Sequence, residues 1–224
     1  MPRPSPVMSR DEKVPYSRAR GAPRRGEARE ALMHAALELV SSEANFSAIS
    51  LRRIARQAGV VPTAFYRHFE DLDALGLTLI EDTFRSLRQI LGDASLASMP
   101  LKGLVRYSVE LFAHYVRDNR LLFQFVVKER FAGTVAMREA IHNEIVLLTH
   151  ALASDLARFD EFSHISQDDL RVISDLVVNT VITLSERILD VDPDNAEDDA
   201  LMLRAEKQLR LIFMGVGRWE SQPG

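Results

Sequence analysis

The sequence predicts an all-α fold, and three observations support this prediction. Aromatic residues make up only 7% of the 224 residues, and runs of β-branched residues are short. Ala, Leu, Arg and Glu, which favour helices, dominate the composition. Apolar residues also recur at helical spacing along most of the chain. We expect a mobile basic arm in residues 1–23, a three-helix head in residues 24–71 and a larger helical body in residues 72–224, each of the last two with its own core.

The first expected helix, residues 25–43, follows a segment without helical periodicity. Residues 1–23 contain five prolines and few apolar side chains, so they have too little apolar surface to form a core. The helix itself is expected to bury one stripe of small and aliphatic side chains, namely Ala28, Leu32, Ala35, Ala36 and Leu39.

Residues 46–69 are typical of two short helices joined by a tight turn. Ser50 suits an N-cap, because its hydroxyl oxygen can accept from backbone N–H groups of the first turn. Gly59 suits the left-handed conformation that ends a helix, and Pro62 suits the first position of the next helix. The expected buried residues are Leu51, Ile54, Ala55 and Ala58 on the first helix, and Ala64, Phe65 and Phe69 on the second. This is the helix-turn-helix pattern, whose second helix enters a DNA major groove.

The polar groups on these two helices distinguish them from an ordinary helical hairpin. The first helix carries Arg52, Arg53 and Arg56. A hairpin that only packs in a core has no reason to collect such groups within about two turns of helix. The residues expected to contact DNA are Arg24, Arg25, Ser50, Arg52, Pro62, Thr63, Ala64, Tyr66, Arg67 and His68. Arg24 and Arg25, like Arg18 and Arg20, are equally consistent with a minor-groove arm and with a solvated tail.

The charge of the chain is divided unevenly along its length. The net charge is −4, which is unusual for a DNA-binding protein. Residues 1–68, however, contain 12 basic and 6 acidic residues, whereas the rest contains 16 basic and 26 acidic residues. A basic N-terminal region on an acidic body directs the attraction for phosphates to one end of the molecule.

Residues 25–80 resemble the DNA-binding domain of the TetR family of bacterial repressors. Tyr66, His68 and Phe69 match the Tyr-x-His-Phe end of the recognition helix in that family. The family usually has a lysine soon after this Phe, whereas Leu72 lies near that position here. Pro62 to Phe69, Asp73 to Thr78, Glu129-Arg130 and Arg138 also resemble a subgroup, the FabR and DesT repressors of unsaturated fatty-acid synthesis. The resemblance implies a homodimeric, ligand-responsive repressor that binds an inverted-repeat operator in double-stranded DNA.

The body is expected to contain further helices at residues 72–92, 101–117, 135–158, 167–189 and 196–219, and a buried apolar segment at residues 119–127. Helix 72–92 has Leu75, Leu79, Ile80, Phe84, Leu87 and Leu91 on its apolar side. Its early turns should touch the head and its later turns the body. We therefore expect it to be the only element that links the two. Breaks are expected at Ser98-Met-Pro100 and at Ala132-Gly133-Thr134.

The two C-terminal helices have apolar stripes wider than one core face requires. The stripes consist of Leu170, Ile173, Val177, Val178, Val181 and Leu184, and of Leu201, Ala205, Leu209, Ile212, Phe213 and Val216. A monomer should leave part of them exposed, so we expect a two-fold, four-helix dimer interface, as the resemblance also implies. Asp190, Asp192 and Asp194 resemble the start of a calcium loop. Asn195 and Leu201 replace its required Gly and Glu, so Asn195 is better interpreted as an N-cap.

Other function classes lack the residues they need. There is no cysteine, no apolar run long enough to cross a bilayer and no signal-peptide pattern, so we expect a cytoplasmic protein. The histidines have no metal-ligand spacing. There is no phosphate-binding glycine loop and no nucleophile elbow. We expect no catalytic residue, no metal site, no cofactor and no membrane partner, and hence no enzyme.

A ligand core is expected in the body, with plain core as the alternative interpretation for each of its residues. The expected lining consists of Leu87, Leu91, Tyr107, Leu111, Phe123, Val126, Arg130, Met137, Arg138, Ile141, Ile145 and Leu148. The resemblance implies a long acyl chain there, as acyl-CoA or another acyl thioester, which needs a tunnel. Arg130 and Arg138 are the candidates for its phosphates, with solvated helix charges as the alternative.

Two other interpretations remain open. A TetR-like repressor of an efflux or catabolic operon would respond to a different small hydrophobic ligand, and a flat cationic drug would need acidic and aromatic groups in the pocket. The chain has one tryptophan and four tyrosines. An architectural DNA-binding protein would need no pocket.

Overall fold

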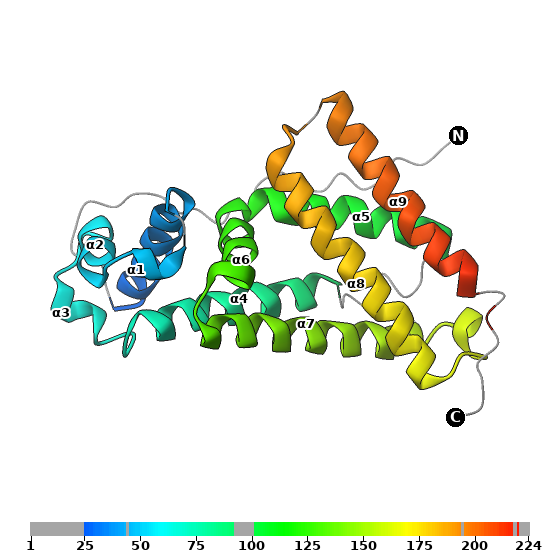
Figure 1. Ribbon diagram of the computed structural model, residues 1–224, viewed down its shortest axis with the longest axis horizontal. Coiled ribbons are helices and arrows are strands. Elements are labelled where there is room, and N and C mark those ends of the chain that lie inside the picture. Colours follow the sequence, from blue (N-terminus) through cyan, green and yellow to red (C-terminus); the bar gives the residue numbers. More distant parts are fainter. Residues whose placement is uncertain (1–24, 44, 92–100, 194, 217–218, 220–224) are drawn as a thin grey trace, which may run out of the picture.

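The computed structural model describes residues 25–43, 45–91, 101–193, 195–216 and 219, and all regular elements within these residues are helical (Figure 1). Of Arg25, Leu91, Leu101 and Lys102 it describes only the backbone. The all-α prediction is confirmed for this part of the chain. The expected arm, Arg24, the side chains of Arg25 and Leu91, and the expected break at Ser98-Met-Pro100 lie outside the described residues.

The head is built from four short elements at one end of the molecule (Figure 1). They are α1 (Arg25–Ser41), the 3-10 turn η1 (Phe46–Ala48), α2 (Leu51–Gln57) and α3 (Pro62–Phe65). Asn45 caps η1, because the backbone N–H of Ala48 donates to its Oδ1 at 3.0 Å. The predicted stripe of α1 is buried except for Leu39, which is half-buried.

Helix α4 (Leu72–Leu91) runs from the head into the body, as predicted (Figure 1). Asp71 starts it, since its Oδ1 accepts from the backbone N–H of Ala74 at 2.8 Å. Gly76 lies where α4 crosses α7, and a Cβ at this position would overlap the terminal methyl group of Met137. Glycine is unfavourable within a helix by about 1 kcal/mol relative to alanine, so close packing explains its presence.

The body continues with α5 (Leu101–Asp118), α6 (Arg120–Ala132), α7 (Val135–Leu156), η3 (Asp160–Phe162), α8 (Gln167–Asp190) and α9 (Ala196–Val216). The predicted break at Gly133 and Thr134 separates α6 from α7. The predicted N-cap Asn195 is confirmed, because its Oδ1 accepts from the N–H of Asp198 at 2.8 Å. Among the described residues, no helix is both long and apolar enough to span a membrane.

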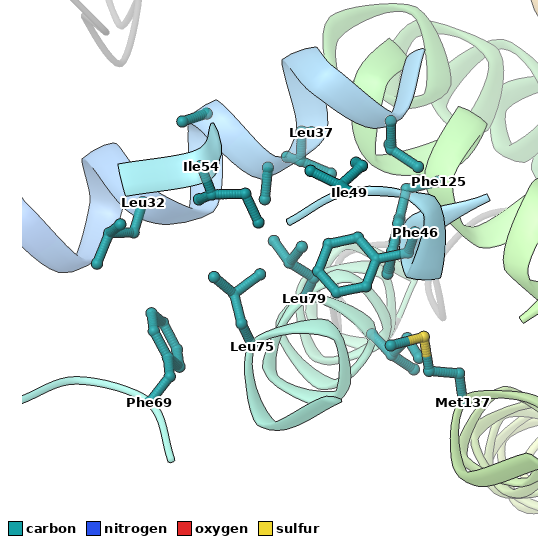
Figure 2. Packing of buried hydrophobic residues seen from close by; sticks show 14 of the residues in the cluster. Leu32, Leu37, Phe46, Ile49, Ile54, Phe69, Leu75, Leu79, Phe125 and Met137 are labelled. Carbon is teal, nitrogen blue, oxygen red and sulfur yellow. The ribbon is translucent and has the colours of Figure 1, made fainter. Parts of the chain in front are cut away.

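One hydrophobic core crosses the expected boundary between head and body (Figure 2). It joins Leu32 and Phe46 of the head to Leu75 of α4, Phe125 of α6 and Met137 of α7. The rings of Phe46 and Phe125 meet edge to face at 5.5 Å between centroids. The head therefore shares its core with the body, contrary to expectation, whereas the body also has cores of its own. The expectation that helix 72–92 alone links the two regions is wrong, because α1 also packs on α6. Aliphatic spacing within one helix does not reveal which other helices it meets.

The apolar stripes of α8 and α9 serve the interior of this chain. All twelve predicted residues are buried or half-buried against α5, α7 and each other. The prediction that part of these stripes is exposed is therefore wrong for the residues named. A different set of large apolar residues is exposed on the same helices, namely Val172, Leu176, Leu203, Leu211 and Met214.

Candidate functional site

The helix-turn-helix has the local structure that its sequence predicts. Ser50 caps α2, with the backbone N–H of Arg53 donating to its Oγ at 3.3 Å. Gly59 has a φ of 70°, a left-handed conformation that other residues rarely adopt. Pro62 is at the first position of α3, where a missing N–H is tolerated. These three residues thus define the start of α2, the turn that follows it and the start of α3.

The recognition helix is shorter than predicted, because α3 ends at Phe65 and continues as a tighter turn. In this turn the N–H of Arg67 donates to the carbonyl of Ala64 at 3.2 Å, and that of His68 to Phe65 at 2.9 Å. Phe65 and Phe69 are buried as predicted, whereas Ala64 is half-buried. The turn therefore still has one apolar side and one side that faces away from the core.

The expected DNA-contacting residues differ in exposure. Thr63, Tyr66 and Arg67 are exposed, and His68 is half-buried. On α2, Arg52 and Arg56 are exposed, as predicted. Arg53 is only partly exposed and forms an ion pair with Glu43, so it ties α2 to the segment that follows α1.

A groove of about 590 Å³ lies in the body, between the end of α6 and helices α7 and α8. Four of the predicted ligand residues line it, namely Arg130, Arg138, Ile141 and Ile145. Its other lining residues are Phe131, His142, Val146, Thr149, His150, Arg171, Val172, Asp175 and Asn179. The lining thus combines an aliphatic surface with three arginines, two histidines and one acidic residue. Arg138, His142, Val146 and His150 recur every fourth residue, which is the signal that sequence reasoning missed.

The other predicted ligand residues do not line this groove. Phe123 is only 6% exposed and packs edge to face on Phe112 and Tyr115. Met137 is fully buried in the core shared with the head. Leu87 and Leu148 are buried in the core of the body, Leu111 and Val126 are half-buried, and Tyr107 is exposed. Four of the predicted ligand residues therefore lie together at the groove, and the others lie elsewhere in the body.

The arginines of the groove already have partners within the protein. Arg130 lies 3.7 Å from Glu186 of α8, and its guanidinium is 5.2 Å from the ring centre of Phe131. Arg138 donates to the backbone carbonyl of Gly133 at 2.5 Å. Arg171 donates to Asp168 at 2.8 Å. An anion that enters the groove therefore competes with these contacts.

The last turn of α6 also holds the head. The ammonium group of Lys128 donates to the carbonyls of Val40, Ser41 and Glu43 at 2.8, 3.1 and 2.9 Å. Glu129 is completely buried, and its Oε1 accepts from the backbone N–H of Phe46 at 2.7 Å. Burial raises the pKa of Glu129, while the Phe46 N–H and Lys128 act in the opposite direction. Sequence reasoning noted Glu129 only as part of a resemblance.

No metal centre is evident in the described part of the chain. Within residues 25–43, 45–91, 101–193, 195–216 and 219, no three His, Cys, Asp or Glu side chains form a group that could hold a metal ion.

Comparisons with known proteins identify the family. Residues 32–76 match the bacterial regulatory proteins of the tetR family, and residues 101–215 match the tetracyclin repressor-like C-terminal domain. The chain therefore belongs to the TetR family. It is a DNA-binding transcriptional regulator, and proteins of this family bind small-molecule effectors and dimerise.

Solved structures of other regulators have the same fold. FadR from Bacillus subtilis, solved in complex with stearoyl-CoA, is 16% identical with a TM-score of 0.66, over 83% of this chain and 98% of that one. FadR from Bacillus halodurans, described as a fatty acid degradation regulator, is 15% identical with a TM-score of 0.66, over 86% and 98%. NalD from Pseudomonas aeruginosa, the secondary repressor of the MexAB-OprM multidrug efflux pump, is 24% identical with a TM-score of 0.62, over 85% and 97%.

Proposed function

We propose that this regulator is a homodimeric repressor that senses a long-chain acyl thioester, such as acyl-CoA, and controls genes of fatty-acid desaturation or synthesis. The observation that carries the proposal is the groove, in which Arg130 and Arg138 lie beside Ile141 and Ile145. An arginine fork matches phosphate oxygens, and an aliphatic surface suits an acyl chain. The resemblance to the FabR and DesT subgroup and the stearoyl-CoA complex of a FadR with this fold both agree with it.

The charge of the groove supports an anionic effector. Residues 69–224 contain more acidic than basic residues, by 26 to 16. The groove is lined by three arginines and one acidic residue, Asp175, while Glu186 and Asp168 pair with Arg130 and Arg171. Arg138 instead donates to the neutral carbonyl of Gly133. Arg138 is therefore the groove cation best placed to attract a phosphate, because a charged oxygen is a stronger acceptor than a neutral carbonyl.

An acyl chain can reach the predicted interior residues only if the side-chain packing of the body changes. Leu87, Phe123 and Leu148 are buried and packed together in the core of the body. Protein interiors are close-packed, so a chain that enters between them must displace side chains. We therefore propose that the liganded body differs in packing from the one described here. This difference is what a sensor requires, because a ligand shifts an equilibrium only through unequal affinity for two states.

The head is proposed to read an inverted-repeat operator. Thr63 and Arg67 face base edges, while Tyr66 and His68 hold phosphates. Ser50, Arg52, Pro62 and Ala64 are proposed to contact DNA, and Arg24 and Arg25 to reach the minor groove as an arm. The dimer presents two recognition helices, so the half-sites lie about 34–36 Å apart or a little more. Outside the groove, the exposed residues Leu176 of α8 and Leu203, Leu211 and Met214 of α9 support a dimer through the two C-terminal helices, since exposed apolar patches mark interfaces.

A thermal-shift panel tests the effector class. It compares acyl-CoA esters of fourteen to eighteen carbons with free coenzyme A and with flat cationic drugs. A ligand at 100 times its dissociation constant stabilises the folded protein by about 2.7 kcal/mol, so binding is readily visible. We expect the long-chain esters to raise the melting temperature and to change operator affinity in a gel-shift titration.

The same panel distinguishes the alternatives. A response to cationic drugs alone would instead favour a repressor of an efflux operon, the second function considered. The groove offers such a ligand only one acidic and one aromatic residue, Asp175 and Phe131, which argues against it. An absence of any response would favour an architectural DNA-binding protein.

A further inference from the structure

We propose that the end of α6 transmits occupancy of the groove to the head through Arg138, Gly133, Glu129 and Phe46. The inference rests on the proposed effector groove and adds a route by which that groove controls DNA binding. α6 stands between the head and α8, and it contacts both (Figure 1). Its consecutive residues Lys128, Glu129 and Arg130 bind the head with the first two side chains and line the groove with the third.

The first contact of the route joins the groove to the end of α6. Arg138 donates from Nη1 to the carbonyl oxygen of Gly133 at 2.5 Å. This carbonyl follows the last turn of α6, where backbone acceptors have no partner within the helix. A phosphate in the groove competes for the same guanidinium, because a charged oxygen is a stronger acceptor than a neutral carbonyl. Anion binding therefore loosens the anchor of Gly133.

The second contact joins Gly133 to Glu129 without free space between them. The N–H of Gly133 donates to the carbonyl of Glu129 at 3.1 Å. A Cβ at position 133 would lie 2.5 Å from that carbonyl oxygen and 2.9 Å from Oε2 of the carboxylate. The backbone conformation of Gly133 is accessible to other residues, with a φ of −71°. Close packing against Glu129 thus explains this glycine, and a shift of Gly133 must move Glu129.

The third contact joins Glu129 to the head. Oε1 accepts from the N–H of Phe46 at 2.7 Å, while Oε2 is buried and has no hydrogen-bond partner among the described residues. The carboxylate therefore depends on the Phe46 N–H, and a displacement would leave a buried polar group unsatisfied. η1 leads through Ile49 and Ser50 directly into α2, which packs on α3. Movement of η1 consequently reaches the recognition helix.

The α4 junction has a different character from this route. Leu75 and Leu79 join α4 to the head through apolar packing, and both are at most 1% exposed. Neither residue lines the groove. The α6 route instead starts at a groove arginine and passes through polar contacts that an anion can disturb. The two connections can therefore act together, with α6 carrying the information on charge in the groove.

Hydrogen exchange of the protein without effector tests the route directly. Arg138→Ala removes the contact between the groove and Gly133. Gly133→Ala disturbs the close packing of Gly133 on Glu129. We expect faster exchange at the amide of Phe46 and an operator dissociation constant changed by about 5-fold or more, the lower range of typical allosteric coupling. Arg158→Ala is the matched control, since Arg158 is an exposed arginine just beyond α7 that pairs with Asp155 and lies outside the groove. If Arg138→Ala exchanges at Phe46 like the wild type, the inference is overturned.

A second measurement separates this inference from the proposed function. Palmitoyl-CoA serves as the probe, and its binding to the wild type is measured by thermal shift. If it does not bind, the proposed effector class fails, while the exchange experiment still decides on the route. If it binds and alters operator affinity, Glu129→Leu, which removes the acceptor of the Phe46 N–H, should reduce that effect by about 5-fold or more. An undiminished effect in Glu129→Leu would contradict the route. Should Gly133→Ala or Glu129→Leu fail to fold, Arg138→Ala carries the test.

Discussion

The DNA-contacting face of the head and the groove of the body hold their functional side chains in different ways. In the head, Thr63, Tyr66 and Arg67 are exposed above a turn whose other side is buried through Phe65 and Phe69. In the groove, Arg130, Arg138 and Arg171 are held by Glu186, the carbonyl of Gly133 and Asp168.

This difference indicates that the two sites bind their partners at different energetic cost. The head presents its polar groups on a packed scaffold, so DNA binding requires little local change. The groove arginines have to leave protein partners before they hold an anion. That exchange weakens effector binding, but it also couples binding to a change in the protein, as a sensor requires. Substitutions in both regions can test this difference.

The largest effect is expected from two phenylalanines, one in each region. Phe65 is fully buried and Phe131 is 71% exposed. Phe65→Ala leaves a cavity and should lower the free energy of unfolding by about 3–5 kcal/mol. Phe131→Ala should change it by at most about 0.5 kcal/mol, as for ordinary surface positions. Urea denaturation measures both, and equal losses would show that the groove is as tightly packed as the head.

The next effect concerns how the head reads DNA. Arg67→Ala should relax base preference by about 1–3 kcal/mol at one position in each half-site, because an arginine fork reads guanine. His68→Ala should weaken binding to all sequences alike, because phosphate contacts carry no sequence information. Selection from a random operator library measures the two patterns. The reverse outcome would mean that the faces of the recognition turn are assigned wrongly.

A smaller effect is expected at the N-cap of α2. Ser50→Ala removes the acceptor for the N–H of Arg53 and should lower the free energy of unfolding by about 1 kcal/mol. Ser50→Asp restores an acceptor and serves as the control. Thermal unfolding of the three proteins measures the effect. If Ser50→Asp were as unstable as Ser50→Ala, the cap would not be the cause.

The smallest effect is a change in the pH dependence of stability, and it arises at Glu129, between the two regions. Burial raises the pKa of Glu129 above its ordinary value of 4.5. The folded protein therefore holds this proton more tightly than the unfolded chain. Its contribution to stability should fall as the pH rises from about 4.5 to the raised pKa and stay constant above it.

Glu129→Gln should remove this decrease in the free energy of unfolding with rising pH. Glu81→Gln, which removes an exposed carboxylate of α4, should leave the decrease in place. Urea unfolding at pH 4.5 to 7.5 provides the comparison. Parallel curves for the wild type and Glu129→Gln would show that folding does not raise the pKa of Glu129.

Much of the head could be predicted from the sequence because its determinants are local. Ser50, Gly59 and Pro62 act through the backbone within a few residues, so residue type and spacing are sufficient. The same holds for Asn195 at the start of α9. Arg53 could not be placed in this way, since its partner Glu43 lies in the segment between α1 and η1.

The groove and the α6 contacts depend on residues that meet only in the folded chain. Glu129 and Phe46 are 83 positions apart, and periodicity contains no information on such a pair. Apolar spacing also cannot distinguish a ligand lining from ordinary core, which is why Phe123 and Met137 were included with Ile141 and Ile145. The spacing of four residues between Arg138, His142, Val146 and His150 could have indicated that these side chains share one face of α7.

The core shared by head and body limits how this protein can be divided or recombined. A fragment that ends at residue 71 would expose Phe46, Ile49 and their neighbours, which Phe125 and Met137 cover in the whole chain. A hybrid regulator that joins this head to the sensor of a relative therefore needs more than a splice within α4. It has to import the matching residues of α6 and α7, including the lysine and glutamate that bind α1 and η1. Exchange of DNA specificity between such regulators is thus easier by substitution on α3 and the turn that follows it than by transplanting whole domains.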